Sequence, residues 1–359
     1  MEAKATVIGS SLVEPSILDL ANNQPLTTVP PRFVRPEIDH PLIRNDDTST
    51  QQLPVIDMHR LLSGDDSELE KLDHTCKEWG FFQLINHGVS SSLVEKVKAE
   101  IQDFFNLPID EKMKFWQQPG DIEGFGQHFI ASEEQKLDWG YGFTMFTLPT
   151  HLRKPHLFPK LPLPFRDDLE VYSTEIKNLT LKILDQMAKA LRMDPNDMEG
   201  LFENGMQAFR MNYYPPCLQP EKVVGHNSHC DASALTVLLQ INEMDGLQIK
   251  KDGKWVAVKP LPDAFVVNIG DVLEILTNGT YPSIEHRATV NSVKERLSLA
   301  TFYSPKLDGE LGPATSLIAP KTPALFKRIS VVDHLKIFFS SELRGKSFVD
   351  FLRIQNQGS

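Results

Sequence analysis

Four side chains able to bind a metal ion occur within six positions of the segment GHNSHCDASALTVLLQ (225–240), namely His226, His229, Cys230 and Asp231. Successive side chains of a β-strand point to opposite faces. If HCDASALTV enters a β core directly, His229 and Asp231 share one face and Cys230 occupies the other. We therefore predict that His229 and Asp231 bind a metal. Cys230 faces the wrong way, and His226 lies where the turn before the strand belongs, so we interpret both as neighbours of the site.

A third ligand is offered by His286, in the segment SIEHRATV of another expected strand. Histidines usually satisfy local hydrogen bonds, so an H-x-D pair alone is a weak signal. Two histidines and one carboxylate, however, form the facial triad of non-haem Fe(II) oxygenases, which leaves coordination positions open. Zinc would prefer a closed tetrahedral set. The sequence predicts an Fe(II) site of His229, Asp231 and His286.

Shortly after His286, the tripeptide Arg296-Leu297-Ser298 places a guanidinium and a hydroxyl on one face of an expected strand. A buried arginine beside a hydroxyl is suited to bidentate capture of a carboxylate. We therefore expect a carboxylate-binding pair, Arg296 and Ser298, near the metal.

Short expected strands separated by turns follow from about residue 206, and they would position these residues. In GLQIKKDGKWVAV, Leu247 and Ile249 alternate with polar residues, and Asp252-Gly253 stands where a hairpin turn belongs. SALTVLLQI and AFVVNIGDVLEIL are further expected strands. Several such strands in succession are typical of a sandwich or barrel with an open end.

The first half of the chain is mixed, and the end is helical. LPVIDM (53–58) and FFQLINHGV (81–89) have the composition of strands, whereas residues 91–108 and 169–193 have helical periodicity. The stretch 115–165 is rich in aromatics and prolines, and we expect a shaped surface there rather than a regular element. The final segment, SVVDHLKIFFSSELRGKSFVDFLRI, is again helical.

Composition limits the possible partners. The 359 residues carry a net charge of −11, which argues against nucleic acid or an anionic membrane as the main partner. No run approaches the ~20 apolar residues that span a bilayer. The N-terminus lacks the pattern of a signal peptide. Three widely spaced cysteines fit a reducing compartment, so we expect a cytoplasmic protein.

Beyond the metal and carboxylate residues, the chain resembles the plant Fe(II)/2-oxoglutarate-dependent dioxygenases from about residue 53 onward. The motifs that carry this resemblance are LPVID, CKEWGFFQLINHGV, FFNLP, EGFGQ, LDW, LPLPFRDDLEVY, RMNYYPPC and AFVVNIGDVLEILTNG. Within the family the chain is most similar to the senescence-related-gene type. That group includes the benzylisoquinoline alkaloid O-demethylases, which also carry LRKPHLF and LTNG.

The resemblance implies a mainly β fold, a double-stranded β-helix (jelly roll) of the isopenicillin N synthase-like type, with helical cover. The expected regions are an N-terminal arm (1–52), a mixed α/β region (53–205), a catalytic jelly roll (206–310) and a C-terminal helical cover (311–359).

The resemblance also assigns roles to residues. It makes His229, Asp231 and His286 the iron ligands, and Arg296 and Ser298 the residues that bind the distal carboxylate of 2-oxoglutarate. Asn212 and Tyr214 match positions that contact the co-substrate. The expected substrate contacts are Phe125, Tyr141, Phe143, Phe302, Phe338 and Phe339.

The implied reaction uses Fe(II), 2-oxoglutarate and O₂, with ascorbate as a stimulant, and releases succinate and CO₂. The expected substrate is a small apolar or aromatic plant metabolite such as an alkaloid, phenylpropanoid or terpenoid. It would be oxidised at an aliphatic or methoxy C–H by hydroxylation or O-demethylation. We expect a monomer that binds neither nucleic acid nor membranes.

Two alternatives remain open at this stage. One is an ascorbate-dependent non-haem iron oxidase of the same fold, which would also carry the R-x-S pair. The other is a non-catalytic cupin-like protein, which would need neither Arg296-x-Ser298 nor the NYYPP segment. The chain departs from its relatives in GYGF (140–143), where many of them carry an acidic residue, and in His226 and Cys230. These departures concern the substrate more than the chemistry.

Overall fold

The computed structural model describes residues 28–35, 52–128, 130, 132–339 and 347–354. Its centre is a double-stranded β-helix (jelly roll), which confirms the predicted fold class. The larger sheet has the order β1-β2-β10-β7-β12-β5-β4-β3. Its strands, in that order, are Val55–Asp57, Phe81–Ile85, Phe265–Ile269, Leu235–Gln240, Arg296–Ser304, Met206–Tyr214, Tyr141–Leu148 and Gly124–Gly126.

The smaller sheet has four strands in the order β6-β11-β8-β9. These strands are His226–His229, His286–Ala288, Leu247–Lys251 and Lys254–Ala257. The turn between β8 and β9 contains Asp252 and Gly253, both with positive φ, as the predicted hairpin requires. A third sheet pairs β13 (Glu310–Leu311) with β14 (Ile329–Ser330).

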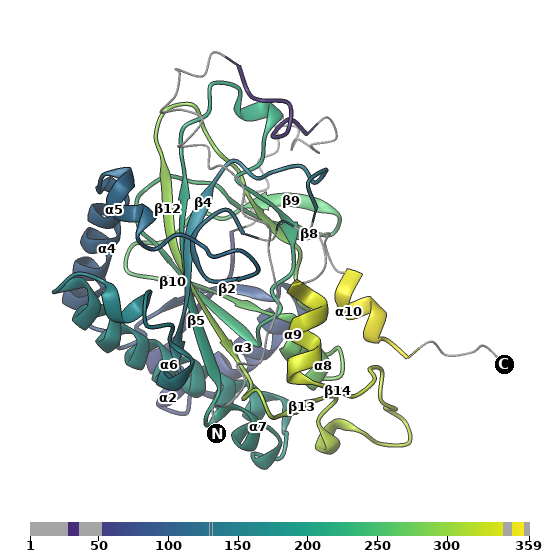
Figure 1. Ribbon diagram of the computed structural model, residues 1–359. Coiled ribbons are helices and arrows are strands. Elements are labelled where there is room, and N and C mark those ends of the chain that lie inside the picture. Colours follow the sequence, from purple (N-terminus) through teal and green to yellow (C-terminus); the bar gives the residue numbers. More distant parts are fainter. Residues whose placement is uncertain (1–27, 36–51, 129, 131, 340–346, 355–359) are drawn as a thin grey trace, which may run out of the picture.

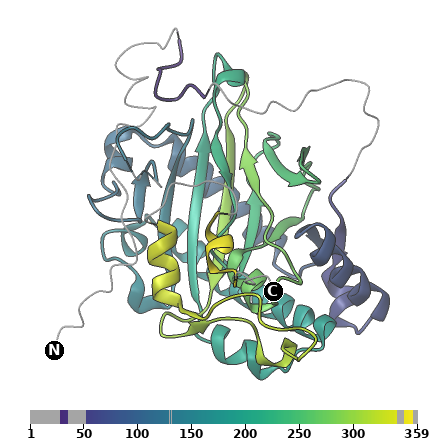
Figure 2. The same ribbon diagram turned by 90° about the vertical axis from the view of Figure 1, so that its right-hand side faces the viewer.

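Helices cover the larger sheet (Figure 1). The long helix α6 contacts β12, β4 and β7, and it packs against α3 and α4. Helix α9 lies on the opposite side of the sheet, where Figure 2 shows it facing the viewer. The helices are α2 (Met58–Leu62), α3 (Asp66–Glu78), α4 (Ser91–Asn106), α5 (Ile109–Met113), α6 (Phe165–Leu191), α7 (Asn196–Phe202), α8 (Asp271–Leu276), α9 (Val331–Phe339) and α10 (Ser347–Leu352).

The alternation of side chains along the central strands separates the core from the site. On β12, Leu297, Leu299 and Tyr303 are fully buried in the main hydrophobic core, whereas Arg296 and Ser298 line a cavity on the other face. The same division occurs on β5, β7 and β4. One face of the larger sheet therefore stabilises the fold, and the other presents side chains for chemistry.

Two sequence expectations about strands were wrong. HCDASALTV is not one strand, because β6 ends at His229 and β7 begins at Leu235. The chain passes here from the smaller sheet to the larger one. AFVVNIGDVLEIL is a strand only as far as Ile269, after which Asp271–Leu276 forms the buried helix α8.

The region 115–165 contains more regular structure than expected. Tyr141–Leu148 forms β4, which pairs with β5 along its length and with β3 on its other edge. Four aromatic residues of this region, Phe125, Tyr141, Phe143 and Phe146, are strand residues.

Most of the predicted N-terminal arm and part of the predicted C-terminal cover lie outside the described residues. Within the arm, Phe33 is buried against Trp139. The larger sheet takes strands from both the 53–205 and the 206–310 stretch, and the proposed boundaries between these regions remain a prediction. None of the helices in the described part of the chain is long and apolar enough to cross a membrane.

Candidate iron and 2-oxoglutarate site

His229 and His286 face each other across two neighbouring strands. His229 is the last residue of β6, His286 is the first residue of β11, and the two are register partners. Their ring centroids are 4.3 Å apart. Together with Asp231 they form a group whose candidate ligand atoms all lie within 4.8 Å of one another. Antiparallel pairing thus brings together two residues that are far apart in the sequence.

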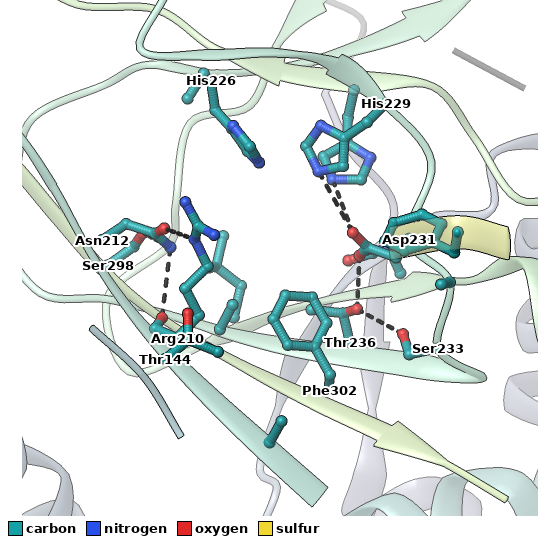
Figure 3. A pocket seen from close by; sticks show the side chains of 18 of the residues that line it. Thr144, Arg210, Asn212, His226, His229, Asp231, Ser233, Thr236, Ser298 and Phe302 are labelled. Carbon is teal, nitrogen blue, oxygen red and sulfur yellow. Dashed lines mark hydrogen bonds and ion pairs between the residues drawn. The ribbon is translucent and has the colours of Figure 1, made fainter. Parts of the chain in front are cut away.

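Asp231 reaches the histidines from the turn between β6 and β7 rather than from a strand. Its Oδ1 lies 3.4 Å from His229 Nε2 and 3.6 Å from His286 Nε2. Its Oδ2 accepts hydrogen bonds from Thr236 Oγ1 at 2.6 Å and from Asn268 Nδ2 at 2.7 Å (Figure 3 shows the bond from Thr236). One carboxylate oxygen is therefore held by the protein, and the other is directed at both imidazoles.

Both histidines are oriented by backbone carbonyl groups. His229 Nδ1 lies 2.7 Å from the carbonyl oxygen of Asn227, and His286 Nδ1 lies 3.0 Å from that of Ile284. A hydrogen on Nδ1 of each ring leaves the Nε2 lone pair for a metal. Burial, and then the neighbouring His229, lower the pKa of His286 to about 4, which favours the neutral ligand form.

The three side chains fit Fe(II). Burial by itself raises the pKa of Asp231, but the two histidines and the hydrogen bond from Asn268 outweigh it, so the carboxyl pKa lies below its usual range. Two imidazole nitrogens and one ionised carboxylate are the donor set of a facial triad, which leaves positions for a co-substrate and O₂.

The hydrogen bond from Thr236 to Asp231 gives a direct test of this arrangement. Thr236→Val keeps the shape of a buried side chain but removes the donor to Oδ2. We expect the affinity for Fe(II) to fall by about 10- to 100-fold, as is typical when a group that orients a metal ligand is lost. Anaerobic calorimetric titration measures this affinity. Thr236→Ser keeps the hydroxyl and should bind Fe(II) nearly normally, and equal affinity in the valine variant would contradict the assignment.

A candidate carboxylate-binding cluster of Arg296, Ser298, Asn212 and Tyr214 lies on β12 and β5, and these residues line the same cavity as the triad. Arg296 pairs in register with Tyr214, and Ser298 pairs with Asn212. Arg296 donates a hydrogen bond from a terminal nitrogen to Gln240 Oε1 at 2.9 Å, and its guanidinium also lies over the ring of Tyr214. Its Nε is buried and has no hydrogen-bond partner among the described residues. A buried guanidinium with an unused donor fits a bound carboxylate, as 2-oxoglutarate would supply.

The six predicted substrate contacts divide into two groups. Phe302, Phe338 and Phe339 line the cavity that also contains the triad. The other three, Phe125, Tyr141 and Phe143, do not line it. They lie in the main hydrophobic core, where Phe143 stacks on Phe104 of α4. Placing them in the pocket was wrong. Tyr141 and Phe143 are on the face of β4 that packs into the core, whereas Thr144 and Phe146 face the cavity, and Phe125 of β3 is likewise buried in the core.

Sequence reasoning also missed several lining residues. Arg210 lies on β5, two positions before Asn212, and donates from Nε to Asn212 Oδ1 at 2.7 Å. Strand alternation from Asn212 and Tyr214 would have indicated it. Thr236 and Asn268 carried no such signal, because their role depends on where the turn places Asp231.

His226 was interpreted as a residue of the turn before the strand. The structure places it at the start of β6, lining the same cavity as the triad. Its Nδ1 lies 2.8 Å from Oδ2 of Asp138. Burial, and then the neighbouring His229, lower its pKa to about 3. It lies outside the group of three candidate ligands.

Comparison with known families gives two matches along the chain. The family described as the 2OG-Fe(II) oxygenase superfamily matches residues 205–305. The N-terminal region described as that of a non-haem dioxygenase in morphine synthesis matches residues 53–161. Together they include every residue of the triad and of the carboxylate-binding cluster.

Individual relatives are similar over nearly their full length. Protein SRG1 of Arabidopsis thaliana is 55% identical, with 99% of this chain and 100% of the relative covered. Oxoglutarate-dependent flavonoid 7-O-demethylase 1 of Ocimum basilicum is 54% identical, with 99% and 95% covered. Codeine O-demethylase of Papaver somniferum is 52% identical, with 97% and 98% covered. The crystal structure of JOX2 in complex with 2OG, Fe and JA superposes with a TM-score of 0.87 at 33% identity, covering 96% of this chain and 99% of that one.

Proposed function

Because the chain belongs to the 2OG-Fe(II) oxygenase superfamily, we propose that it oxidises an aromatic, largely apolar plant metabolite at a methoxy or aliphatic C–H. The protein is a 2-oxoglutarate-dependent non-haem iron dioxygenase that uses Fe(II), 2-oxoglutarate and O₂. Membership of this family removes the alternative of a non-catalytic cupin-like protein. The proposal therefore concerns the substrate and the outcome of its oxidation.

The geometry supports the proposed assignment of site residues. His229, Asp231 and His286 would hold the iron, and Arg296 with Ser298 would bind the distal carboxylate of 2-oxoglutarate. Bound Fe(II) and 2-oxoglutarate activate O₂ for C–H oxidation, with succinate and CO₂ as the co-products. Asn212 and Tyr214 would orient 2-oxoglutarate between the iron and the carboxylate-binding pair, because Asn212 is the register partner of Ser298 and Tyr214 is that of Arg296. The buried position of all three ligands keeps bulk water from the reacting centre.

The cavity wall supports an apolar aromatic substrate. Side chains of β4, β5, β12 and α9 line the cavity, and most of them are apolar. Phe302 lies across it from the triad, as Figure 3 shows. The apolar residues of these elements are Phe146, Met206, Ala208, Ala300, Phe302, Leu335, Phe338 and Phe339, and Ile122, which precedes β3, adds to them. Aromatic and aliphatic walls with few polar groups are typical of sites for small, flat ligands.

The relatives support O-demethylation as the outcome. Three of the similar proteins carry names that state removal of a methyl group from a flavonoid, from codeine or from thebaine. Hydroxylation of a methoxy carbon gives a hemiacetal, which collapses to formaldehyde and a free hydroxyl. The same chemistry at a different C–H would give a stable hydroxylated product, so the position of the substrate decides between the two.

The experiment that tests this function supplies the purified protein with Fe(II), ascorbate, 2-oxoglutarate and a panel of methoxylated flavones and benzylisoquinolines. We expect succinate to form together with an equal amount of formaldehyde, both followed by mass spectrometry. A product heavier by one oxygen without formaldehyde would identify hydroxylation instead. Oxidation that proceeds without 2-oxoglutarate would favour the ascorbate-dependent oxidase, and no oxidation of any compound would refute the proposed substrate class.

We further propose a cytoplasmic monomer that binds neither nucleic acid nor membranes and is stimulated by ascorbate. The net charge of −11 supports the expectation that neither nucleic acid nor an anionic membrane is a partner. Cys76, Cys217 and Cys230 are buried and form no disulfide, which is consistent with a reducing compartment.

A further inference from the structure

Ile122 is an apolar residue of the cavity wall that belongs to neither a helix nor a strand. It lies in the loop between α5 and β3, and it lines the cavity together with Phe146 of β4. A loop residue does not take its orientation from the alternation of a strand, so the contacts of the loop must fix it. Its two neighbours, Asp121 and Glu123, make these contacts.

Glu123 takes the place of a missing strand partner. The ladder between β3 and β4 ends at the pair Gly124 and Thr144, and two residues further along it would pair Ile122 with Phe146. The chain leaves the ladder before that point. The backbone N–H of Phe146 donates instead to Oε2 of Glu123 at 2.8 Å. The Glu123 side chain thus ties the loop to β4, while Ile122 lines the cavity instead of continuing the strand.

Lys154 supplies the positive charge for this carboxylate. Glu123 is 3% exposed, and a carboxylate so deeply buried needs compensation. Burial raises the pKa of Glu123, and the Phe146 N–H and Lys154 oppose this rise. The ammonium group of Lys154 lies 3.3 Å from Glu123 Oε1 and also forms an ion pair with Asp121. Oδ1 of Asp121 in turn accepts the backbone N–H of Ile122 at 2.7 Å. One lysine therefore holds both carboxylates that flank Ile122.

The segment that carries Lys154 is itself anchored. It is the motif LRKPHLF (152–158). The preceding residue, Arg153, donates from Nε to the carbonyl oxygen of Thr147 at 2.7 Å, and both of its terminal nitrogens pair with Glu170 of α6. Ion pairs between exposed side chains contribute little, but Lys154 joins an anchored segment to a buried carboxylate. Its loss should therefore displace the loop before β3.

We propose that Lys154 is a positioning residue for the substrate, because it holds Asp121 and Glu123 and through them keeps Ile122 in the cavity wall. The proposal rests on the proposed function, since it assumes an apolar substrate against this wall. Lys154 does not itself line the cavity, so it acts only through the loop. An apolar wall binds the substrate and its transition state about equally, and loss of such binding raises KM without changing kcat.

The test is Lys154→Met, which keeps the aliphatic stem and removes the charge. With 7-methoxyflavone as substrate, or the panel compound that the wild-type protein oxidises fastest, we expect KM to rise about tenfold, the size of effect that a changed contact in an apolar pocket produces. The values of kcat and of the KM for 2-oxoglutarate should be unchanged, as should succinate formation in the absence of substrate. Initial rates of formaldehyde and succinate formation measure all of these. Lys154→Arg keeps the charge and should stay close to the wild type.

Further variants show whether Lys154 acts through the loop. Lys154→Met combined with Glu123→Gln leaves no buried charge uncompensated and should restore part of the substrate KM. Ile122→Ala should raise this KM by itself, and adding Lys154→Met should then raise it little further, because residues that act through one contact are not additive. The matched control is Lys114→Met, which removes a surface ion pair with Glu111 and should leave every constant unchanged.

An unchanged substrate KM in Lys154→Met, or an equal rise in the KM values for substrate and 2-oxoglutarate, would overturn the proposal. If this variant loses its circular dichroism signal, Asp121→Asn weakens the same ion pair from its more exposed side. A smaller rise in the substrate KM alone is then expected, and no rise would overturn the proposal. If the wild-type protein oxidises no compound of the panel, the proposed substrate class fails, and this inference falls with it.

Discussion

Replacing His229 by alanine is expected to abolish succinate formation while the fold is retained. The change removes one of two imidazoles whose Nε2 atoms converge on Asp231 Oδ1. Loss of a group that only orients a metal ligand costs about 10- to 100-fold in affinity or activity, and loss of the ligand itself should exceed that. Mass spectrometry of succinate, anaerobic Fe(II) titration and circular dichroism together measure activity, metal binding and folding.

The matched control for this variant is His59→Ala. His59 is an exposed histidine of α2, on the outside of the fold, and its loss should leave Fe(II) binding and succinate formation unchanged. Normal turnover in His229→Ala would show that the triad assignment is wrong. Loss of the circular dichroism signal would instead mean that the side chain is needed for folding, and the Fe(II) titration of Thr236→Val then tests the site independently.

The second large effect is expected at Arg296. This arginine is 2% exposed, and its buried Nε has no partner among the described residues. Removing one member of a buried, charged, hydrogen-bonded pair costs about 3–5 kcal/mol. We therefore expect Arg296→Leu to raise the KM for 2-oxoglutarate by at least about a hundredfold, because 1.4 kcal/mol corresponds to a factor of ten. Initial rates at varied 2-oxoglutarate concentration measure this change.

Two further arginine variants separate charge from geometry. Arg296→Lys keeps a positive charge but loses the planar fork that binds a carboxylate bidentately, so an intermediate KM is expected. Arg328→Gln changes an exposed arginine that forms a surface ion pair with Glu310, and it should behave as the wild type. An unchanged KM in Arg296→Leu would move the carboxylate-binding role to another residue.

The alternation of side chains along a strand predicted much of the site, because this alternation depends only on residues that are close together in the sequence. Arg296 and Ser298 lie two positions apart on one strand and face one side, as the alternation rule requires. His286 was recognisable as a third candidate ligand by residue type and by its place on another strand. What the pattern could not supply was the pairing of strands, since the register between β6 and β11 depends on the whole smaller sheet.

The errors arose where a regular element changes direction. Asp231 was placed on a strand, but the chain leaves the smaller sheet after His229, and the turn directs the carboxylate toward the same point. Tyr141 and Phe143 were assigned to the pocket because the resemblance places the 120–145 segment, expected to be a loop, in its wall. The register between β4 and β5 decides which residues of β4 face the cavity and which face the helices. A shift of one position would exchange the two faces.

Helix α8 shows a second reason why secondary structure could not be predicted fully from the sequence. Asp271–Leu276 continues an apolar run that begins in β10, and apolar residues in such a run do not distinguish a buried strand from a buried helix. The change of direction coincides with Gly270, whose Cβ position would lie 2.1 Å from the carbonyl oxygen of Ser233. The backbone of the β6–β7 turn packs directly against Gly270. This contact depends on the tertiary structure, so the sequence around Gly270 could not reveal it.

The two sheets meet at the ligand set itself. Both histidines belong to the smaller sheet, Asp231 lies in the segment that leads into the larger one, and its orienting partners Thr236 and Asn268 are strand residues of that larger sheet. An ion bound by these three side chains would act as a cross-link between the halves of the sandwich. Its binding free energy would add to the free energy of unfolding, by an amount that grows with the concentration of free metal. The metal that supplies the chemistry would thus also hold together the walls of the cavity in which the chemistry occurs.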